Sequence, residues 1–102
     1  MAGKRPRTQR RADARATRKL IHDRERLWRL SPGGAVERPI TVVSPAVIDA
    51  RVAAMRCPQC ENEYALQAHD VTSAGDRVVS VRCKLCHVAR QIWFRLGSAS
   101  PN

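Results

Sequence analysis

The sequence predicts a small α+β fold, in which a basic arm and two helices precede a three-stranded antiparallel sheet held together by a cysteine cluster. Three observations predict it. Two C-x-x-C pairs stand 22 residues apart, apolar residues between and after them alternate with a period of two, and apolar residues before them recur at helical spacing. A chain of 102 residues has room for one small domain and a tail.

The first thirty residues carry most of the positive charge. They hold 11 Lys or Arg and 3 Asp or Glu, net +8, whereas residues 31–102 hold 8 and 6, net +2. Residues 1–7 offer little to bury, which is typical of a disordered tail. From about residue 8 to residue 30, good helix formers and apolar residues three and four positions apart predict an amphipathic helix. Its apolar positions are Ala12, Ala16, Leu20, Ile21, Leu27 and Trp28.

A linker and a second helix are predicted to follow. Residues 31–34 read Ser-Pro-Gly-Gly, which ends the first helix because proline breaks the hydrogen-bond ladder and glycine readily takes the left-handed cap conformation. Residues 39–43 are rich in β-branched side chains and predict a short extended segment. Ser44 and Pro45 are typical of a helix start, with serine capping, and this helix should end near Ala54. One side of it carries Val47, Ile48, Val52 and Met55.

Period-two alternation predicts the sheet. A first strand includes Tyr64 and Leu66, residues 72–76 form a turn, and a second strand reaches Cys83. The last strand, residues 90–96, places Ile92, Phe94 and Leu96 on one face and Trp93 and Arg95 on the other. The chain therefore divides into a basic arm with its helix (1–30), a linker with a short bracing helix (31–54), a cysteine module (55–96) and a polar tail (97–102).

The cysteine spacing is the strongest functional signal, and the four candidate metal ligands are Cys57, Cys60, Cys83 and Cys86. Each pair places two thiolates on one tight turn, so four sulfurs can surround one ion tetrahedrally at about 2.3 Å. Thiolates favour zinc over calcium or magnesium, which predicts one structural Zn²⁺. The module has too few large apolar residues to fold without that ion. Nearby bases are expected to offset the charge of the four thiolates, namely Arg56, Arg82, Lys84 and Arg90.

Other uses of these cysteines have less support. Structural disulfides need an oxidising compartment, and a thioredoxin-type pair needs a βαβ setting that the sequence lacks. Cys83 to His87 matches the C-x-x-C-H signature of c-type haem attachment, but haem would leave Cys57 and Cys60 without a role. His87 could also replace a cysteine as a ligand, although four thiolates already complete the shell.

The stretch from Met55 to Leu96, with turns Cys-Pro-Gln-Cys and Cys-Lys-Leu-Cys, resembles the zinc-ribbon domains of RNA polymerase subunits, transcription factors, ribosomal proteins and many small bacterial proteins. Turns of that family usually read C-P-x-C-G and C-x-x-C-G. Here Pro58 matches, while Glu61 and His87 occupy the positions where glycine is common. Ribbons that assist transcript cleavage carry an Asp-Glu pair at the hairpin tip. This tip carries Asp76 followed by arginine, so the resemblance does not imply that activity.

The charge distribution predicts that the protein binds DNA, RNA or a nucleoprotein assembly through its Arg-rich N-terminal arm. Trp93 and Arg95 share a strand face that could stack on unpaired bases or pack within the fold. No Ser/His/Asp or paired-carboxylate constellation is evident, and a closed thiolate shell leaves zinc no open position for water. We therefore expect a non-enzymatic protein. The residues expected to contact phosphate are Lys4, Arg5, Arg7, Arg10, Arg11, Arg15, Arg18 and Lys19.

An alternative hypothesis is a protein-interaction adaptor with a purely structural zinc site, whose helix contacts a partner or folds back through Leu20, Ile21, Leu27 and Trp28. No apolar run approaches the roughly 20 residues that cross a bilayer, and no secretory apolar run follows the basic N-terminus. We therefore expect no membrane association and a cytoplasmic protein, with the nucleoid or ribosome as possible sites. The Arg-rich N-terminus also loosely resembles a mitochondrial transit peptide.

Overall fold

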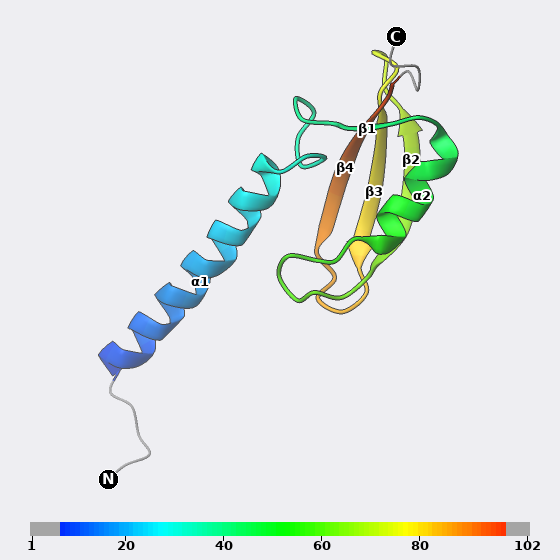
Figure 1. Ribbon diagram of the computed structural model, residues 1–102. Coiled ribbons are helices and arrows are strands. Elements are labelled where there is room, and N and C mark those ends of the chain that lie inside the picture. The colour runs from blue at the N-terminus through cyan, green and yellow to red at the C-terminus, as the bar shows by residue number, and fades with distance from the viewer. Residues whose placement is uncertain (1–6, 98–102) are drawn as a thin grey trace.

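The computed structural model describes residues 7–97. Its four strands form one mixed sheet in the order β1-β4-β3-β2, α2 lies across one face of that sheet, and α1 projects away from it (Figure 1). The molecule is consequently elongated, with extents of 69 × 24 × 23 Å. In chain order the elements are α1 (Arg7–Leu30), β1 (Ile40–Val42), α2 (Pro45–Ala54), β2 (Tyr64–Val71), β3 (Arg77–Cys83) and β4 (Ala89–Leu96).

The three strands expected from period-two alternation are present and antiparallel. Tyr64 pairs with Cys83 between β2 and β3, and Val79 pairs with Ile92 between β3 and β4. The turn between β2 and β3 lies where the sequence predicts it. Its closure uses Gly75 at φ 91°, a left-handed conformation that glycine adopts without steric cost.

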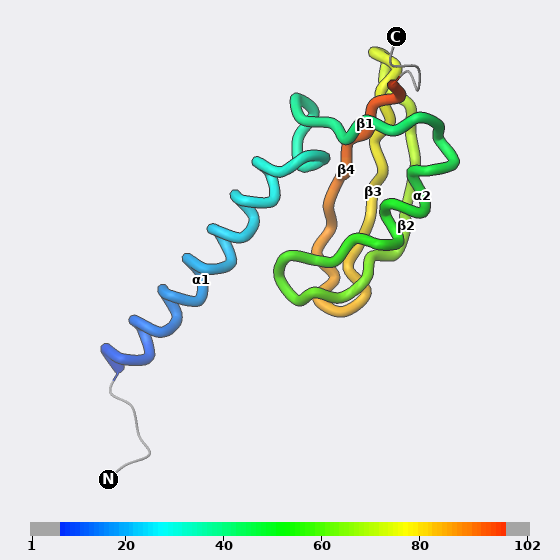
Figure 2. Tube along the Cα trace, in the orientation of Figure 1, coloured from blue at the N-terminus to red at the C-terminus, as the bar shows by residue number. Residues whose placement is uncertain are grey.

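The prediction of a three-stranded, wholly antiparallel sheet is wrong, because β1 adds a fourth strand parallel to β4. The register places Ile40 beside Phe94 and Val42 beside Leu96. Figure 2 shows β1 next to the end of β4. Ile40 and Val42 are buried, whereas Thr41 between them is exposed. Three residues are too short a segment for alternation to reveal a pairing partner, and the partner strand lies about fifty residues further along the chain, so only an extended segment was predictable here.

The helix α2 packs on the sheet as expected, with Ile48 and Val52 buried and Val47 and Met55 beside the core. Ser44 occupies the N-cap position in an extended conformation and Pro45 begins the helix, but the Ser44 side chain makes no capping hydrogen bond, contrary to the prediction. The other core residues from the sheet are Ile40, Val42, Tyr64, Val79, Val81, Ile92 and Phe94, joined by Cys57 and Cys83.

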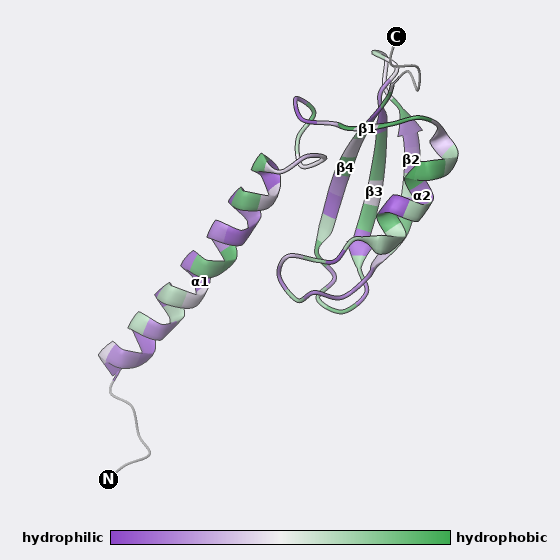
Figure 3. Cartoon of the chain, viewed as in Figure 1, coloured by the Kyte–Doolittle hydropathy of each residue, from purple (hydrophilic) through white to green (hydrophobic). Residues whose placement is uncertain are grey.

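The helix α1 begins at Arg7, one residue earlier than predicted, and ends at Leu30 as expected. It carries both polar and apolar residues around its surface (Figure 3), and none of its residues is fully buried. Leu20 is 49% and Leu27 is 67% exposed, so of the predicted apolar face only Trp28 packs against the core. Within residues 7–97, neither helix combines the length and apolar character needed to cross a membrane.

Candidate metal centre

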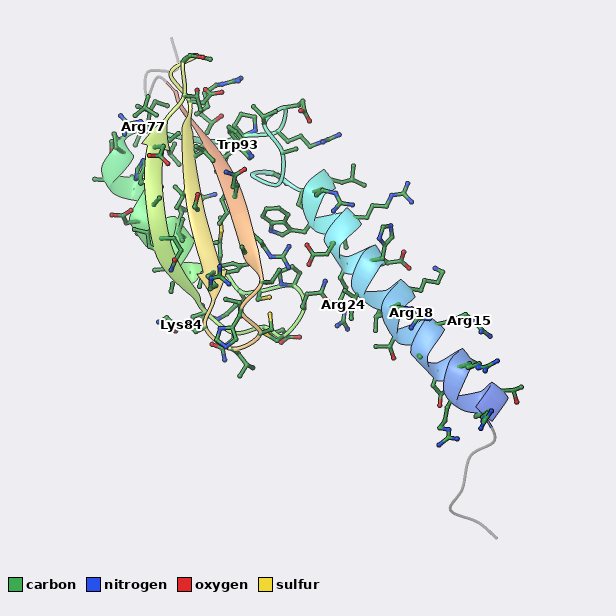
Figure 4. All side chains as sticks on the ribbon, turned by 180° about the vertical axis from the view of Figure 1, so that it is seen from behind. Arg15, Arg18, Arg24, Arg77, Lys84 and Trp93 are labelled. Carbon is green, nitrogen blue, oxygen red and sulfur yellow. The ribbon has the colours of Figure 1, made fainter. Side chains whose placement is uncertain are left out.

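The structure brings all four predicted cysteine ligands together at one end of the sheet, near Lys84 (Figure 4). Their sulfur atoms all lie within 4.8 Å of one another. The Sγ atoms of Cys57 and Cys86 are 3.7 Å apart, and those of Cys60 and Cys83 are 3.2 Å apart. A tetrahedral ion with bonds of about 2.3 Å requires sulfur separations of roughly 3.8 Å. These four free thiols could therefore hold one metal ion.

The two cysteine turns have the same backbone hydrogen bonds. In the first turn, the Glu61 N–H donates to the Cys57 carbonyl at 2.7 Å, and the Cys57 N–H donates to the Asn62 carbonyl at 2.9 Å. In the second turn, the His87 N–H donates to the Cys83 carbonyl at 3.1 Å, and the Cys83 N–H donates to the Val88 carbonyl at 2.9 Å. The repeat of C-x-x-C in the sequence thus becomes two similar turns that face each other.

Backbone N–H groups of the second turn point at a sulfur. The N–H groups of Leu85 and Cys86 lie 3.4 and 3.5 Å from the Cys83 Sγ. The Lys84 N–H donates to the Glu63 carbonyl at 3.0 Å, which ties this turn to the chain that leaves the first turn. The two N–H groups favour negative charge on the Cys83 sulfur, and the Lys84 hydrogen bond helps to fix the position of the turn.

Four thiols this close cannot all ionise without a cation. Burial raises the pKa of Cys83, but N–H groups of Cys86 and Leu85 and the neighbouring thiols outweigh it and lower that pKa to about 6. For Cys86, a backbone hydrogen bond at Val88 lowers the pKa, yet burial and the other three sulfurs raise it to about 12. A divalent ion supplies the charge that lets every sulfur become a thiolate.

Glu61 and His87 end the two turns in left-handed backbone conformations, at φ 63° and 65°. These are the two positions where the zinc-ribbon sequences usually carry glycine. A side chain at such φ costs about 1–2 kcal/mol, because its Cβ approaches the following carbonyl. His87, the alternative ligand considered above, is exposed at this position and is not part of the metal-binding group.

Replacing either residue by glycine should therefore stabilise the protein. We expect Glu61→Gly and His87→Gly each to raise the free energy of unfolding by about 1 kcal/mol, measured by urea denaturation. Leu85→Gly is the matched control, since Leu85 is exposed in the same turn without a positive φ, and it should lower stability by about 0.5–1 kcal/mol. Equal losses of unfolding free energy in all three variants would contradict backbone strain at Glu61 and His87.

Only one of the four bases expected beside the cluster reaches a sulfur. The Arg90 side chain is 2% exposed, and its guanidinium lies 4.0 Å from the Cys57 Sγ. The others bind elsewhere: Arg82 donates to the His87 carbonyl, Lys84 pairs with Glu63 at 3.3 Å, and Arg56 donates to carbonyls of α2 and the residue after it. Arg56, Arg82 and Lys84 therefore make no direct contact with a sulfur. That they offset the charge of the four thiolates from a greater distance stays a prediction.

The same Arg90 side chain connects α1 to the cysteine cluster. Its two terminal nitrogens donate to the Glu25 carboxylate, and the guanidinium carbon lies 4.9 Å from the centre of the Trp28 ring. The hydrogen bond from Arg90 is the largest cause that holds the pKa of Glu25 below its usual value, against a smaller opposing effect of burial. Glu25 therefore stays ionised at neutral pH and compensates the buried guanidinium.

The first cysteine turn holds α1 as well. Gln59, between the two cysteines, donates to the Glu25 carboxylate at 2.6 Å and to the Ile21 carbonyl at 2.9 Å. Arg24 donates to the Gln59 carbonyl at 3.4 Å. Sequence reasoning missed Glu25 and Gln59, because nothing in an isolated carboxylate or amide indicates a partner more than thirty residues away.

The predicted phosphate-binding residues lie on α1, except Lys4 and Arg5, which are outside the described residues. All of the rest are exposed, and Lys19 pairs with Asp23 on the surface at 2.9 Å. At 3.6 residues per turn, most of them fall within about a third of the helix circumference, while Arg10 lies on another side. Two further exposed bases extend this basic face, which consists of Arg7, Arg11, Arg15, Arg18, Lys19, Arg26 and Arg29.

Comparison with protein families, with curated proteins and with solved structures found no match to this chain.

Proposed function

We propose that this chain is a non-enzymatic zinc-ribbon protein that binds nucleic acid, alone or within a nucleoprotein assembly, through the basic face of α1. The observation that carries the proposal is the placement of that face. Its bases lie along a helix that projects from the sheet and is held to it through its C-terminal turns (Figure 1). An exposed row of guanidinium groups suits a phosphate backbone.

The proposed ion is a single structural Zn²⁺. Four sulfur ligands in two facing turns favour zinc among common ions, and a complete thiolate shell leaves no position for a reacting water. We propose that the ion fixes the cysteine turns at one end of the sheet, and that these turns hold the C-terminal half of α1. The basic face would then point in a fixed direction. We propose that the protein acts in the cytoplasm.

Salt should weaken nucleic-acid binding steeply. If about six phosphates are neutralised, log K should fall against log salt with a slope near −5, measured by fluorescence anisotropy with a labelled oligonucleotide. The double variant Arg15→Ala with Arg18→Ala should reduce that slope by about 1.8.

The matched control removes two exposed bases that lie off α1, as Arg38→Ala with Arg51→Ala, which lowers net charge equally. It should leave the slope close to that of the unmodified protein. Equal effects from both double variants, or binding that does not respond to salt, would contradict the assignment to the basic face.

A second candidate function is a protein-interaction adaptor, favoured by the exposure of Leu20, Ile21 and Leu27 on α1. The two candidates can be separated by deleting residues 1–19. That deletion removes five of the seven bases of the basic face, so it should greatly weaken nucleic-acid binding and spare a partner contact made by Leu27 and Trp28.

A further inference from the structure

Within residues 7–97, α2 covers one face of the sheet and no helix packs across the other. Side chains alternate across a strand, so the register that turns Val79 and Ile92 into the core turns Ser80 and Gln91 to the opposite face. The helix α2 packs on the core face, and in Figure 4 it lies behind the sheet while the opposite face is turned to the viewer. We call this opposite side the open face.

A groove of 470 Å³ crosses the open face, within the range of about 300–1,000 Å³ typical of ligand sites. The side chains at its base are small: Ser80 lies in the middle of β3, and Ala89 is the first residue of β4. Around them stand two exposed amides and one guanidinium, from Gln67, Gln91 and Arg82. This set offers hydrogen-bond donors and acceptors side by side without a negative charge.

A second groove of 220 Å³ continues from the first at the edge of β4. The two share Ala89, Arg90 and Gln91. The second is also lined by Trp28, Arg29 and Trp93. Trp28 already covers the Arg90 guanidinium, which leaves the half-buried Trp93 as the ring available for stacking. Glu25 is the acidic residue lining this groove, and its carboxylate is bound to Arg90.

From this arrangement we infer that the open face binds unpaired nucleotides of single-stranded nucleic acid, with one base stacked on Trp93 and hydrogen-bonded by Gln91, and a neighbouring base hydrogen-bonded by Gln67 in the first groove. The inference rests on the proposed function and specifies its ligand. Amide side chains match the paired donor and acceptor of a base edge, which only an unpaired base presents to a flat surface. Arg29 belongs to both the second groove and the basic face, so one strand can contact the two surfaces in succession.

The test compares single-stranded RNA, single-stranded DNA and a duplex, each about 10 nucleotides long, on the zinc-loaded full chain. Trp93→Leu should weaken binding of single strands about tenfold and leave duplex binding unchanged. The double variant Gln67→Ala with Gln91→Ala should also weaken binding of single strands. This double variant provides the test if Trp93→Leu does not fold. Gln9→Ala removes an exposed amide of α1 and is the matched control, with no expected loss.

Backbone and side-chain NMR spectra give a second readout. A short single strand should shift the side-chain amide signals of Gln67 and Gln91 and the indole N–H of Trp93. The inference is overturned if single strands shift α1 signals alone and the groove variants bind normally, a result that leaves the proposed function intact. If the unmodified protein binds no nucleic acid at low salt, the proposed function fails as well.

Discussion

Removing the metal should unfold the sheet. With the ion absent, mutual repulsion keeps some thiols protonated, as the high pKa of Cys86 indicates, and the two cysteine turns lose their common centre. Structural zinc contributes roughly 10–16 kcal/mol in small zinc-binding peptides, which is as large as the total stability of about 5–15 kcal/mol of a typical domain. We expect a chelator to abolish the strand signal in circular dichroism and the dispersion of the NMR spectrum.

Adding zinc back should restore the fold, whereas magnesium should not, because magnesium does not favour thiolate ligands. Cys57→Ser should reproduce the effect of the chelator in part, since it removes a buried ligand. A circular dichroism spectrum that stays unchanged after complete metal removal would refute the dependence of the fold on the ion.

Breaking the ion pair between Glu25 and Arg90 should have the second largest effect. Glu25→Gln leaves a guanidinium that is 2% exposed beside a neutral partner, and breaking a buried pair typically costs about 3–5 kcal/mol. Because the Glu25 side chain is 25% exposed, we expect a loss of about 2–3 kcal/mol in urea denaturation of the zinc-loaded protein. The C-terminal half of α1 should also separate from the first cysteine turn.

The matched control is Asp23→Asn, which neutralises a carboxylate on the same helix that pairs with Lys19 on the exposed surface. Such surface pairs contribute about 0–1 kcal/mol. Hydrogen exchange at the amides of α1 would report the separation of the helix in Glu25→Gln. Similar stabilities for the two variants would show that Arg90 does not depend on Glu25.

Much of the fold was predictable because its signals are local. Helical spacing and the Ser-Pro-Gly-Gly stop located α1 within one residue, and alternation located β2, β3 and β4. The cysteine spacing identified the metal-binding group, since two C-x-x-C pairs joined by a hairpin meet at one end of a sheet. Glu61 and His87, noted in the sequence as departures from the glycines of zinc ribbons, are the two non-glycine residues between 7 and 97 with positive φ, but their backbone conformation was not predicted from the sequence.

The missed features all depend on contacts between distant segments. The pairing of β1 with β4 joins residues more than fifty positions apart, and Glu25 contacts Arg90 across 65 positions. Exposure of Leu20 and Leu27 could not be read from spacing either, because an amphipathic pattern does not say how much of a helix meets the core. Arg90 itself was expected near the sulfurs, but not its role in holding α1.

The central claim is that four cysteines hold one zinc ion. Elemental analysis of freshly purified protein, combined with X-ray absorption at the zinc edge, tests it directly. We predict one zinc per chain, surrounded by four sulfur atoms at about 2.3 Å. Protein without stoichiometric metal, or zinc bound mainly by nitrogen and oxygen, would contradict the claim.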